Sequence, residues 1–234
     1  MNHTIASQII YEDNHLLIIN KKAGQLVQGD KTGDESLLDL IKNHIKKRDQ
    51  KPGNVFLGLV HRIDRPTSGL VIYAKTSKAL TRLTQMVKNR EIQKTYWAVV
   101  SKNEIPASGR LVHYLQKNEK TNKATVFIKP TDNAKESVLN YQILKQLDNF
   151  QLLEIDLETG RHHQIRAQLS KIGVPIKGDL KYGAARSNPD GGIHLHARKL
   201  QFVHPVTKES IEIIAPVPQN DSVWLACERI AQGE

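Results

Sequence analysis

The stretch His61-Arg62-Ile63-Asp64-Arg65-Pro66-Thr67-Ser68-Gly69 leads directly into the apolar run Leu70-Val71-Ile72-Tyr73-Ala74. It places one carboxylate, Asp64, among three basic side chains, those of His61, Arg62 and Arg65. Neighbouring positive charges favour the ionised form of a carboxylate. The same charges form a surface that can bind a polyanion. Two interpretations are therefore open: charge balance at the start of a buried strand, or a reactive carboxylate in a basic site.

The composition is that of a globular chain with a large excess of positive charge. Its 234 residues are 39% hydrophobic and 25% charged, which suits a folded domain with a real core. The net charge of +10 indicates a polyanionic partner, most simply nucleic acid. No apolar run approaches the ~20 residues of a membrane-spanning helix, so we expect no membrane partner. With Cys227 as the single cysteine, no internal disulfide can form, and we expect a cytoplasmic protein.

Several classes of site are excluded by the residues that the chain lacks. One cysteine cannot build a four-cysteine zinc site or the zinc centre of nucleobase deaminases. There is no phosphate-binding P-loop and no set of kinase motifs. The pair His162-His163 is a weak metal signal, because no HExxH pattern is present and adjacent helical side chains point about 100° apart. We therefore expect no metal site.

Hydrophobic periodicity predicts an α+β fold with a mixed, mainly antiparallel β-sheet core and flanking helices. We expect helices after Ser36, Ser77 and Gly160 and a last helix at about 222–231. No repeat or flexible linker is evident, so residues 1–234 are expected to form a single domain. The expected strands are 8–11, 16–19, 55–60, 95–100, 123–129, 137–144, 150–157, 194–203 and 210–214.

The helix that Gly160 opens carries an arginine beside an apolar stripe. Ile165 and Leu169 belong to the stripe, while His162 and Arg166, four residues apart, are predicted to share a helix face. An Arg166 head that points inward would require a carboxylate, because an unpaired buried charge is very costly. The alternative is that its stem packs on the stripe while the guanidinium reaches water.

Taken together, these stretches resemble the RluA-type pseudouridine synthases. Residues 61–70 resemble the family signature HRLDRxTSGLL, with Ile63 in place of leucine. His162 stands where the family usually has threonine, and Lys22 where proline commonly follows a lysine. Four more stretches match in the expected order: Lys94-Thr95-Tyr96 resembles KxY, residues 160–166 resemble GRTHQIR, residues 178–183 resemble GDxxYG, and residues 194–205 resemble LHAxxLxFxHP.

The resemblance implies the pseudouridine synthase catalytic fold and the conversion of uridine to pseudouridine in RNA, with neither cofactor nor metal. It implies that Asp64 is the catalytic carboxylate, that Arg166 forms an ion pair with it, and that Tyr96 contacts the uracil ring. The target base must be flipped out of its stack to reach Asp64.

The remaining expected contacts concern the bound RNA. Arg62 is expected to occupy the vacated stack and Arg65 to serve as a charge partner. Ile165 and Leu169 are expected to give apolar contact to the base. Arg161 and Lys181 are expected to contact phosphates.

The matching stretches begin at about residue 8, so we expect no N-terminal S4 domain and a similarity to members with the catalytic domain alone. Such members act on tRNA, on large-subunit rRNA or on both, and a monomer without a protein partner is the default. Two alternatives remain. One is a non-catalytic RNA-binding or chaperone protein that keeps the fold, and the other is an N-glycosylase that releases the base.

Overall fold

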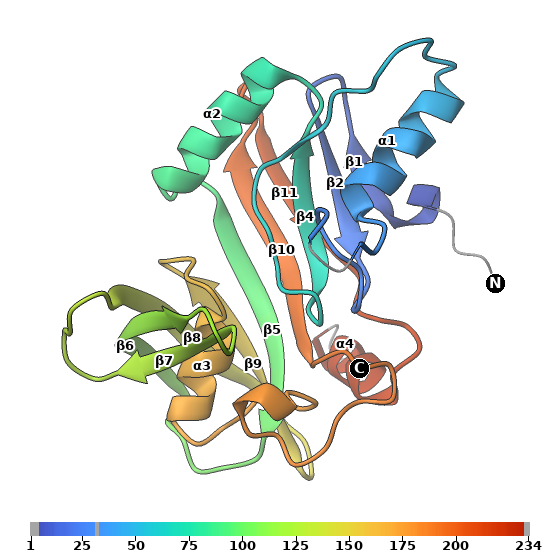
Figure 1. The fold of residues 1–234 in the computed structure, drawn as a ribbon. Coiled ribbons are helices and arrows are strands. Elements are labelled where there is room, and N and C mark those ends of the chain that lie inside the picture. The colour runs from blue at the N-terminus through green and yellow to red at the C-terminus, as the bar shows by residue number, and fades with distance from the viewer. Residues whose placement is uncertain (1–4, 31–32, 232–234) are drawn as a thin grey trace. The chain divides into compact units, whose positions relative to one another are not determined.

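The computed structural model describes residues 5–30 and 33–231, which divide into two compact units (Figure 1). Unit 1 comprises residues 1–93 and 197–216, and unit 2 comprises residues 94–196 and 217–234. Among the described residues, no helix is both long and apolar enough to cross a membrane.

Unit 1 is built on strands in the order β1-β2-β4-β10, with β3 paired to β4 and β11 paired to β10. The β1–β2, β2–β4, β3–β4 and β10–β11 pairs are antiparallel. The register of β2 on β4 runs from Leu16 opposite Ala74 to Lys21 opposite Gly69. A short 3-10 helix, Ile5–Gln8, precedes these strands. Their bounds are β1 Ile9–Glu12, β2 Leu16–Lys21, β3 Gly58–Leu59, β4 Ser68–Ala74, β10 Leu195–Val203 and β11 Ser210–Ile214.

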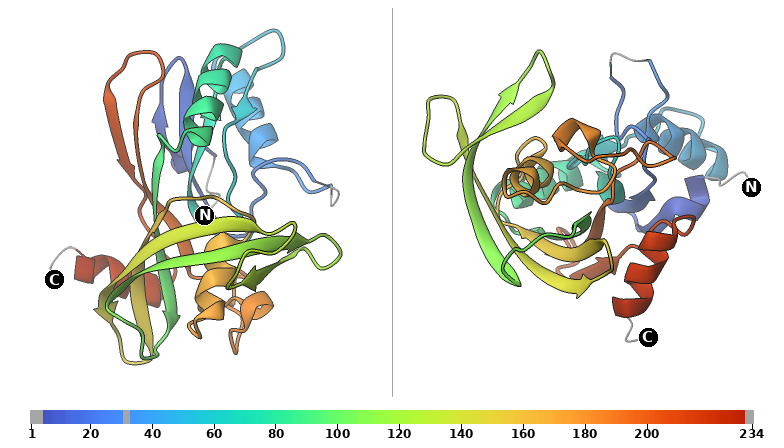
Figure 2. Two further views of the ribbon diagram at one scale, coloured as in Figure 1. Left: turned by 90° about the vertical axis from the view of Figure 1, so that its left-hand side faces the viewer. Right: turned by 90° about the horizontal axis from the view of Figure 1, so that it is seen from below.

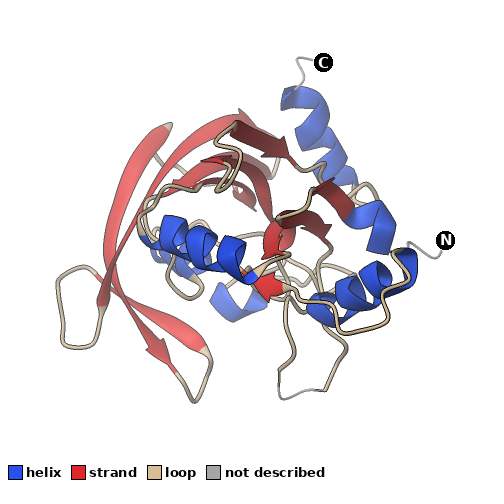
Figure 3. Ribbon diagram, turned by 90° about the horizontal axis from the view of Figure 1, so that it is seen from above, coloured by secondary structure: helices blue, strands red, loops and turns tan. Residues whose placement is uncertain are grey.

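Figure 3 shows the helices in blue and the strands in red. Two of these helices, α1 and α2, belong to unit 1, and both are capped. Helix α1 (Leu37–Arg48) begins after Ser36, whose side chain accepts from the Asp39 N–H as predicted. Helix α2 (Ser77–Lys88) is capped by Thr76, not by Ser77 as expected, because Thr76 has the extended backbone of a cap residue and accepts from the Ala79 N–H. In the buried core, side chains of β2 and β4 cluster with those of α2. The core includes Leu16, Ile18, Leu70, Ile72 and Leu83.

Unit 2 contains antiparallel strands in the order β5-β9-β8-β6-β7. Strands β6 and β8 are long and curved (Figure 2). Strand β6 was not predicted, because its side chains are mostly exposed or half-buried and its apolar signal is weak. The bounds are β5 Gln93–Ser101, β6 Ser108–Asn118, β7 Lys123–Phe127, β8 Lys135–Gln146 and β9 Phe150–Leu157.

The helices of unit 2 are α3 (Gln164–Lys171) and α4 (Ser222–Ala231), with a 3-10 turn, η2, at Leu180–Tyr182. Gln168 of α3 donates from Nε2 to the carbonyl oxygens of Leu111 and Ser137, which ties the helix to β6 and β8. The expected mixed, mainly antiparallel α+β architecture is confirmed.

Two expected elements differ most from the structure, and other strand bounds shift by one or two residues. The strand predicted at 55–60 is reduced to Gly58–Leu59. Helix α3 begins at Gln164 and not directly after Gly160, because His163 has the left-handed backbone angles φ 51° and ψ 26°, which end any helix that would include it.

Gly69 is placed where a side chain cannot fit. Its φ is +111°, and a β-carbon added there would lie 2.5 Å from the backbone nitrogen of Ala197 on β10. We expect Gly69→Ala to lower the free energy of unfolding by about 2 to 5 kcal/mol, measured by urea denaturation. Gly29→Ala is the matched control, because a β-carbon there meets nothing within 4 Å. Equal stabilities of the two variants would contradict this account.

Candidate functional site

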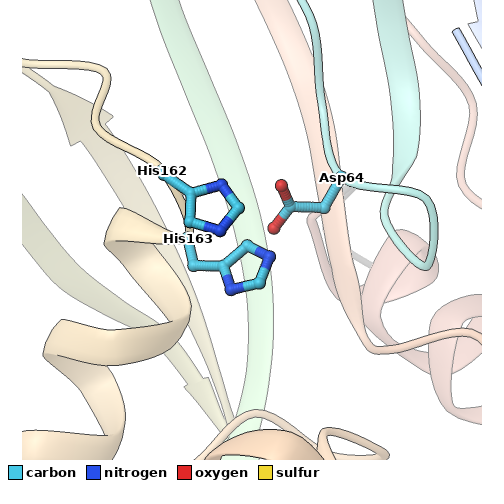
Figure 4. A group of neighbouring side chains, drawn as sticks. All are labelled: Asp64, His162 and His163. Carbon is cyan, nitrogen blue, oxygen red and sulfur yellow. The ribbon is translucent and has the colours of Figure 1, made fainter. Parts of the chain in front are cut away.

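In unit 1 the candidate site is the loop between β3 and β4, which carries Asp64 (Figure 4). The Thr67 N–H donates to the Asp64 carbonyl oxygen over 3.0 Å and closes a tight turn. Before this turn, Nε2 of His61 accepts from the Ile72 N–H of β4 over 3.3 Å. Ile63 is buried, while the Asp64 side chain is half-buried. The loop is therefore anchored on both sides of a carboxylate that solvent still reaches.

The buried side chain of Lys21 is hydrogen-bonded to the backbone of the loop that carries Asp64. Lys21, at the end of β2, is fully buried and donates from Nζ to the carbonyl oxygens of Lys22, Gln25 and Arg65, each over 2.9 Å. These bonds use all three N–H donors of the ammonium group and join the loop after β2 to the loop that carries Asp64. Burial lowers the pKa of Lys21 to about 7, although the negative charge of Asp64 opposes the shift.

The two arginines that flank Asp64 are both exposed. Arg65 donates from Nε to the Gly24 carbonyl oxygen over 2.9 Å and pairs with Asp34 over 2.8 Å. The Gly24 N–H in turn donates to the Arg65 carbonyl oxygen. Arg65 therefore helps to join the same two loops, beside its expected role as a charge partner. The RNA contacts expected of Arg62 and Arg65 remain predictions.

The low pKa of Lys21 predicts a pH-dependent stability. Between about 7 and the ordinary 10.5, the unfolded chain holds a proton that the folded chain has lost, so unfolding takes up a proton. Stability from this group therefore rises with pH above about 7, by up to about 1.4 kcal/mol per pH unit. Lys21→Met removes the titrating group. The difference in unfolding free energy between wild type and Lys21→Met should grow in favour of wild type from about pH 7 to about pH 9.

Urea denaturation of both proteins across that pH range measures this difference. All other titrating groups are the same in the two proteins, so their contributions to the difference in unfolding free energy cancel. A difference that stays constant with pH would mean that Lys21 keeps its proton in the folded chain.

In unit 2 the centre of the candidate site is a buried ion pair. Nε and Nη2 of Arg166 donate to the two carboxylate oxygens of Asp179 over 2.7 and 2.8 Å, and the two side chains are only 5% and 1% exposed. The alternative in which the Arg166 head reaches water is therefore wrong. The required carboxylate within this unit is Asp179. The pairing of Arg166 with Asp64 remains a prediction.

The two histidines before α3 are arranged differently from the sequence expectation. Their rings are stacked, with centroids 3.8 Å apart and planes 24° apart (Figure 4). His163 is the N-cap residue of α3, and His162 lies one residue before it, outside the helix. The prediction that His162 and Arg166 share a helix face is therefore wrong. The position where the family usually has threonine is that of His162, and it is not the N-cap position of α3.

Tyr182 connects His163 to β7. Its Oη accepts from the Ala124 N–H over 2.7 Å and lies 2.9 Å from Nδ1 of His163. The carbonyl oxygen of Tyr182 accepts from the Ser170 hydroxyl of α3 over 2.6 Å. The 3-10 turn is thus held to the N-cap residue and the last turn of α3 and to strand β7.

The other predicted residues of unit 2 lie around α3 or on β5. Tyr96 is buried on β5 opposite Ile155 of β9. Ile165 and Leu169 are buried on α3, 4% and 0% exposed. Their expected contacts with the uracil remain predictions.

The two predicted phosphate ligands, Arg161 and Lys181, are exposed. Nε of Arg161 donates to the Glu136 carbonyl oxygen over 3.1 Å, and Nζ of Lys181 to that of Asn122 over 3.2 Å. Unit 2 therefore gathers Arg161, Arg166 and Lys181 near α3, and unit 1 gathers Arg62, Asp64 and Arg65 in one loop.

Three residues of these sites were not selected from the sequence: Lys21, Asp179 and Tyr182. Each lies in a stretch that resembles a family motif, and this was the available signal. Their partners are backbone groups or residues at a distance along the chain, and the sequence does not specify these.

Comparisons with known proteins found relatives that cover most of this chain. The family model for RNA pseudouridylate synthase matches residues 15–171. The uncharacterized RNA pseudouridine synthase YlyB of Bacillus subtilis is 34% identical over 215 residues, which cover 91% of this chain and 69% of that protein. Ribosomal large subunit pseudouridine synthase D of Xylella fastidiosa is 33% identical, with 96% and 70% covered. Ribosomal large subunit pseudouridine synthase C of Vibrio cholerae is 36% identical, with 89% and 65% covered.

A solved structure is similar over nearly the whole chain. Human RNA pseudouridylate synthase domain containing 4 has a TM-score of 0.79 at 24% identity, with 96% of this chain and 94% of that chain covered. At this identity the likeness shows the fold alone.

Proposed function

This chain belongs to the RluA-type family of RNA pseudouridine synthases and is an isomerase that acts on RNA, and we propose that it modifies uridine in large-subunit ribosomal RNA. The names of two relatives, ribosomal large subunit pseudouridine synthases C and D, support this substrate over tRNA, which is the second candidate.

The proposed reaction breaks the bond between N1 of uracil and C1′ of the ribose, turns the base, and joins C5 to C1′. The proton on C5 must then leave and N1 must gain one, so the atoms balance without a co-reactant. Asp64 acts on the ribose as an ionised carboxylate, and Tyr96 contacts the ring. Arg166 supplies positive charge that keeps a carboxylate ionised.

The observation that carries the proposal is the anchored Asp64 loop. Three bonds from Lys21, together with the Arg65–Gly24 bonds, fix the backbone beside the carboxylate. Catalysis by a single carboxylate depends on accurate positioning, because a group held in the reacting geometry avoids the entropy cost of finding it. A protein that only binds RNA has no need of such an anchor.

The test uses the purified chain and two unmodified transcripts, large-subunit rRNA and a tRNA pool. Pseudouridine is mapped after incubation, and free uracil is measured in the same reactions. We expect new pseudouridine in the rRNA and no free uracil. Modification of tRNA alone would overturn the proposed substrate. Release of uracil would favour an N-glycosylase, and neither product with firm RNA binding would favour a non-catalytic protein.

A further inference from the structure

A buried side-chain amide, that of Asn188, forms hydrogen bonds to three other residues of unit 2. Its Oδ1 accepts from Nζ of Lys177 over 2.8 Å, and its Nδ2 donates to the Gly192 carbonyl oxygen over 3.0 Å. The same Nδ2 lies 2.9 Å from Nδ1 of His194, directly before β10. Asn188 and His194 are only 7% and 1% exposed. Asn188 lies outside the stretches that resemble family motifs, and the proposed function gives it no role.

The chemistry of two partners fixes how this amide is turned. An ammonium group can only donate, so the atom that faces Lys177 is the oxygen. A backbone carbonyl oxygen can only accept, so the atom that faces Gly192 is the nitrogen. The second N–H of the amide nitrogen then has Nδ1 of His194 as the acceptor within reach. An amide turned the other way would lose all three bonds.

The same arrangement keeps the ring of His194 neutral. Nδ1 accepts from Asn188 and therefore carries no proton, while Nε2 lies 3.1 Å from Oδ1 of Asp221. That oxygen also accepts from two backbone N–H groups of α4, so the ring proton lies on Nε2 and is donated to it. Burial lowers the pKa of His194. The charge of Lys177 lowers this pKa further, whereas those of Asp221 and Asp190 raise it.

The amide of Asn188 packs against the turn that presents Asp179. Gly178 has φ +89°, and a β-carbon added there would lie 2.5 Å from Nδ2 of Asn188. Lys177 precedes Gly178, and its carbonyl oxygen accepts from the His194 N–H over 2.9 Å. Asp179 follows Gly178 and accepts both hydrogen bonds of the buried ion pair. The place of Asp179 therefore depends on contacts that Asn188 and His194 make with the two residues before it.

We infer that Asn188 is a positioning residue for the ion pair of Arg166 and Asp179. It fixes the turn at Gly178, and His194 locks its amide from the other side. A guanidinium bound through two nitrogens is held in both place and direction. Misplacing a group near the reaction by about 1 Å can cost about a hundredfold in rate. The geometry rests on unit 2 alone, and the effect on the reaction rests on the proposed function, in which Arg166 keeps a carboxylate ionised.

The first test observes Arg166 directly and needs no RNA. Nitrogen NMR of the ¹⁵N-labelled full chain resolves its Nε–H, which is identified as the signal that Arg166→Lys removes. In wild type this N–H is buried and bonded to Asp179, so we expect slow exchange with solvent. Leucine has nearly the shape of asparagine and forms none of its hydrogen bonds. Asn188→Leu should therefore speed this exchange by about tenfold or more.

The matched control is Gln151→Met. Gln151 is another buried amide of unit 2, 2% exposed on β9, and it has no bond to the turn at Gly178. We expect this variant to leave the exchange of the Arg166 Nε–H unchanged. An equal rise in both variants, or no rise in Asn188→Leu, would overturn the inference.

Activity separates positioning from RNA binding. We expect kcat to fall by about ten- to hundredfold in Asn188→Leu, with KM for the RNA within about threefold of wild type, because the buried amide offers no surface to the RNA. Gln151→Met should keep kcat. Melting temperatures are measured for both variants. A loss of kcat that merely follows the loss of melting temperature in the two variants would give Asn188 a purely structural role and overturn the inference.

A second variant, Asn188→Asp, changes the fold less and carries a signature in pH. Its carboxylate keeps the bond from Lys177 but has no N–H for Nδ1 of His194. A protonated His194 can donate to that carboxylate instead, and the added negative charge raises the pKa of His194 above its value in wild type. The rate of Asn188→Asp relative to wild type should therefore rise as the pH falls from about 8 to about 6. A relative rate that does not change with pH would contradict the inferred network.

The inference and the proposed function fail in different ways. Wild-type protein that modifies no RNA overturns the function, while the exchange of the Arg166 Nε–H still decides the inference. An active wild type whose kcat and Nε–H exchange are both retained in Asn188→Leu overturns only the inference.

Discussion

Replacing Asp64 by asparagine is expected to abolish pseudouridine formation, with a loss of about a thousandfold or more in the single-turnover rate. Asparagine has nearly the shape of aspartate but carries no charge, so it can neither attack the ribose nor accept its proton. The loop itself should survive, because the bonds that anchor it come from Lys21, Arg65 and backbone groups. RNA affinity should therefore change little.

The matched control is Asp34→Asn. Asp34 also belongs to unit 1, and its carboxylate pairs with Arg65 at an exposed position. Exposed ion pairs contribute about 0 to 1 kcal/mol, so we expect a rate within about threefold of wild type. Pseudouridine formed by Asp64→Asn at a rate close to that of the control would rule out the assigned role of Asp64.

The largest effect on stability is expected from Asp179→Asn. The substitution leaves Arg166 charged and buried, without the carboxylate that accepts its two hydrogen bonds. Removing one partner of a buried ion pair lowers the free energy of unfolding by about 3 to 5 kcal/mol, because the remaining charge is uncompensated. Urea denaturation should therefore show a large fall in the free energy of unfolding.

A second variant shows whether this loss comes from the unpaired charge. Arg166→Met with Asp179→Leu removes both charges and keeps apolar volume, and it should be more stable than Asp179→Asn alone. The exposed pair of Arg110 on β6 and Glu158 directly after β9, in the same unit, provides the control, and Glu158→Gln should change stability far less. A double variant as unstable as the single variant would mean that shape, and not charge, is what the site requires.

The sequence by itself determined the family, the chemistry and most of the elements. Ordered motifs around Asp64, Tyr96 and Arg166 identified the reaction class. Local hydrophobic periodicity placed β9, β11 and α4 at their observed bounds, because side-chain alternation and helical spacing are recorded in neighbouring residues. Strand β6 was missed for the same reason, since its half-exposed residues lack a clear pattern.

Tertiary structure decided how the site residues are held. The partner of Arg166 lies 13 residues away along the chain, and the partners of Lys21 are carbonyl oxygens, which every residue possesses and no motif records. The backbone of His163 turns left-handed because the chain must enter α3 from the loop and place its ring against Tyr182. Such features depend on which backbone groups are brought together in space. They arise from packing over long range, and composition and spacing along the chain do not specify them.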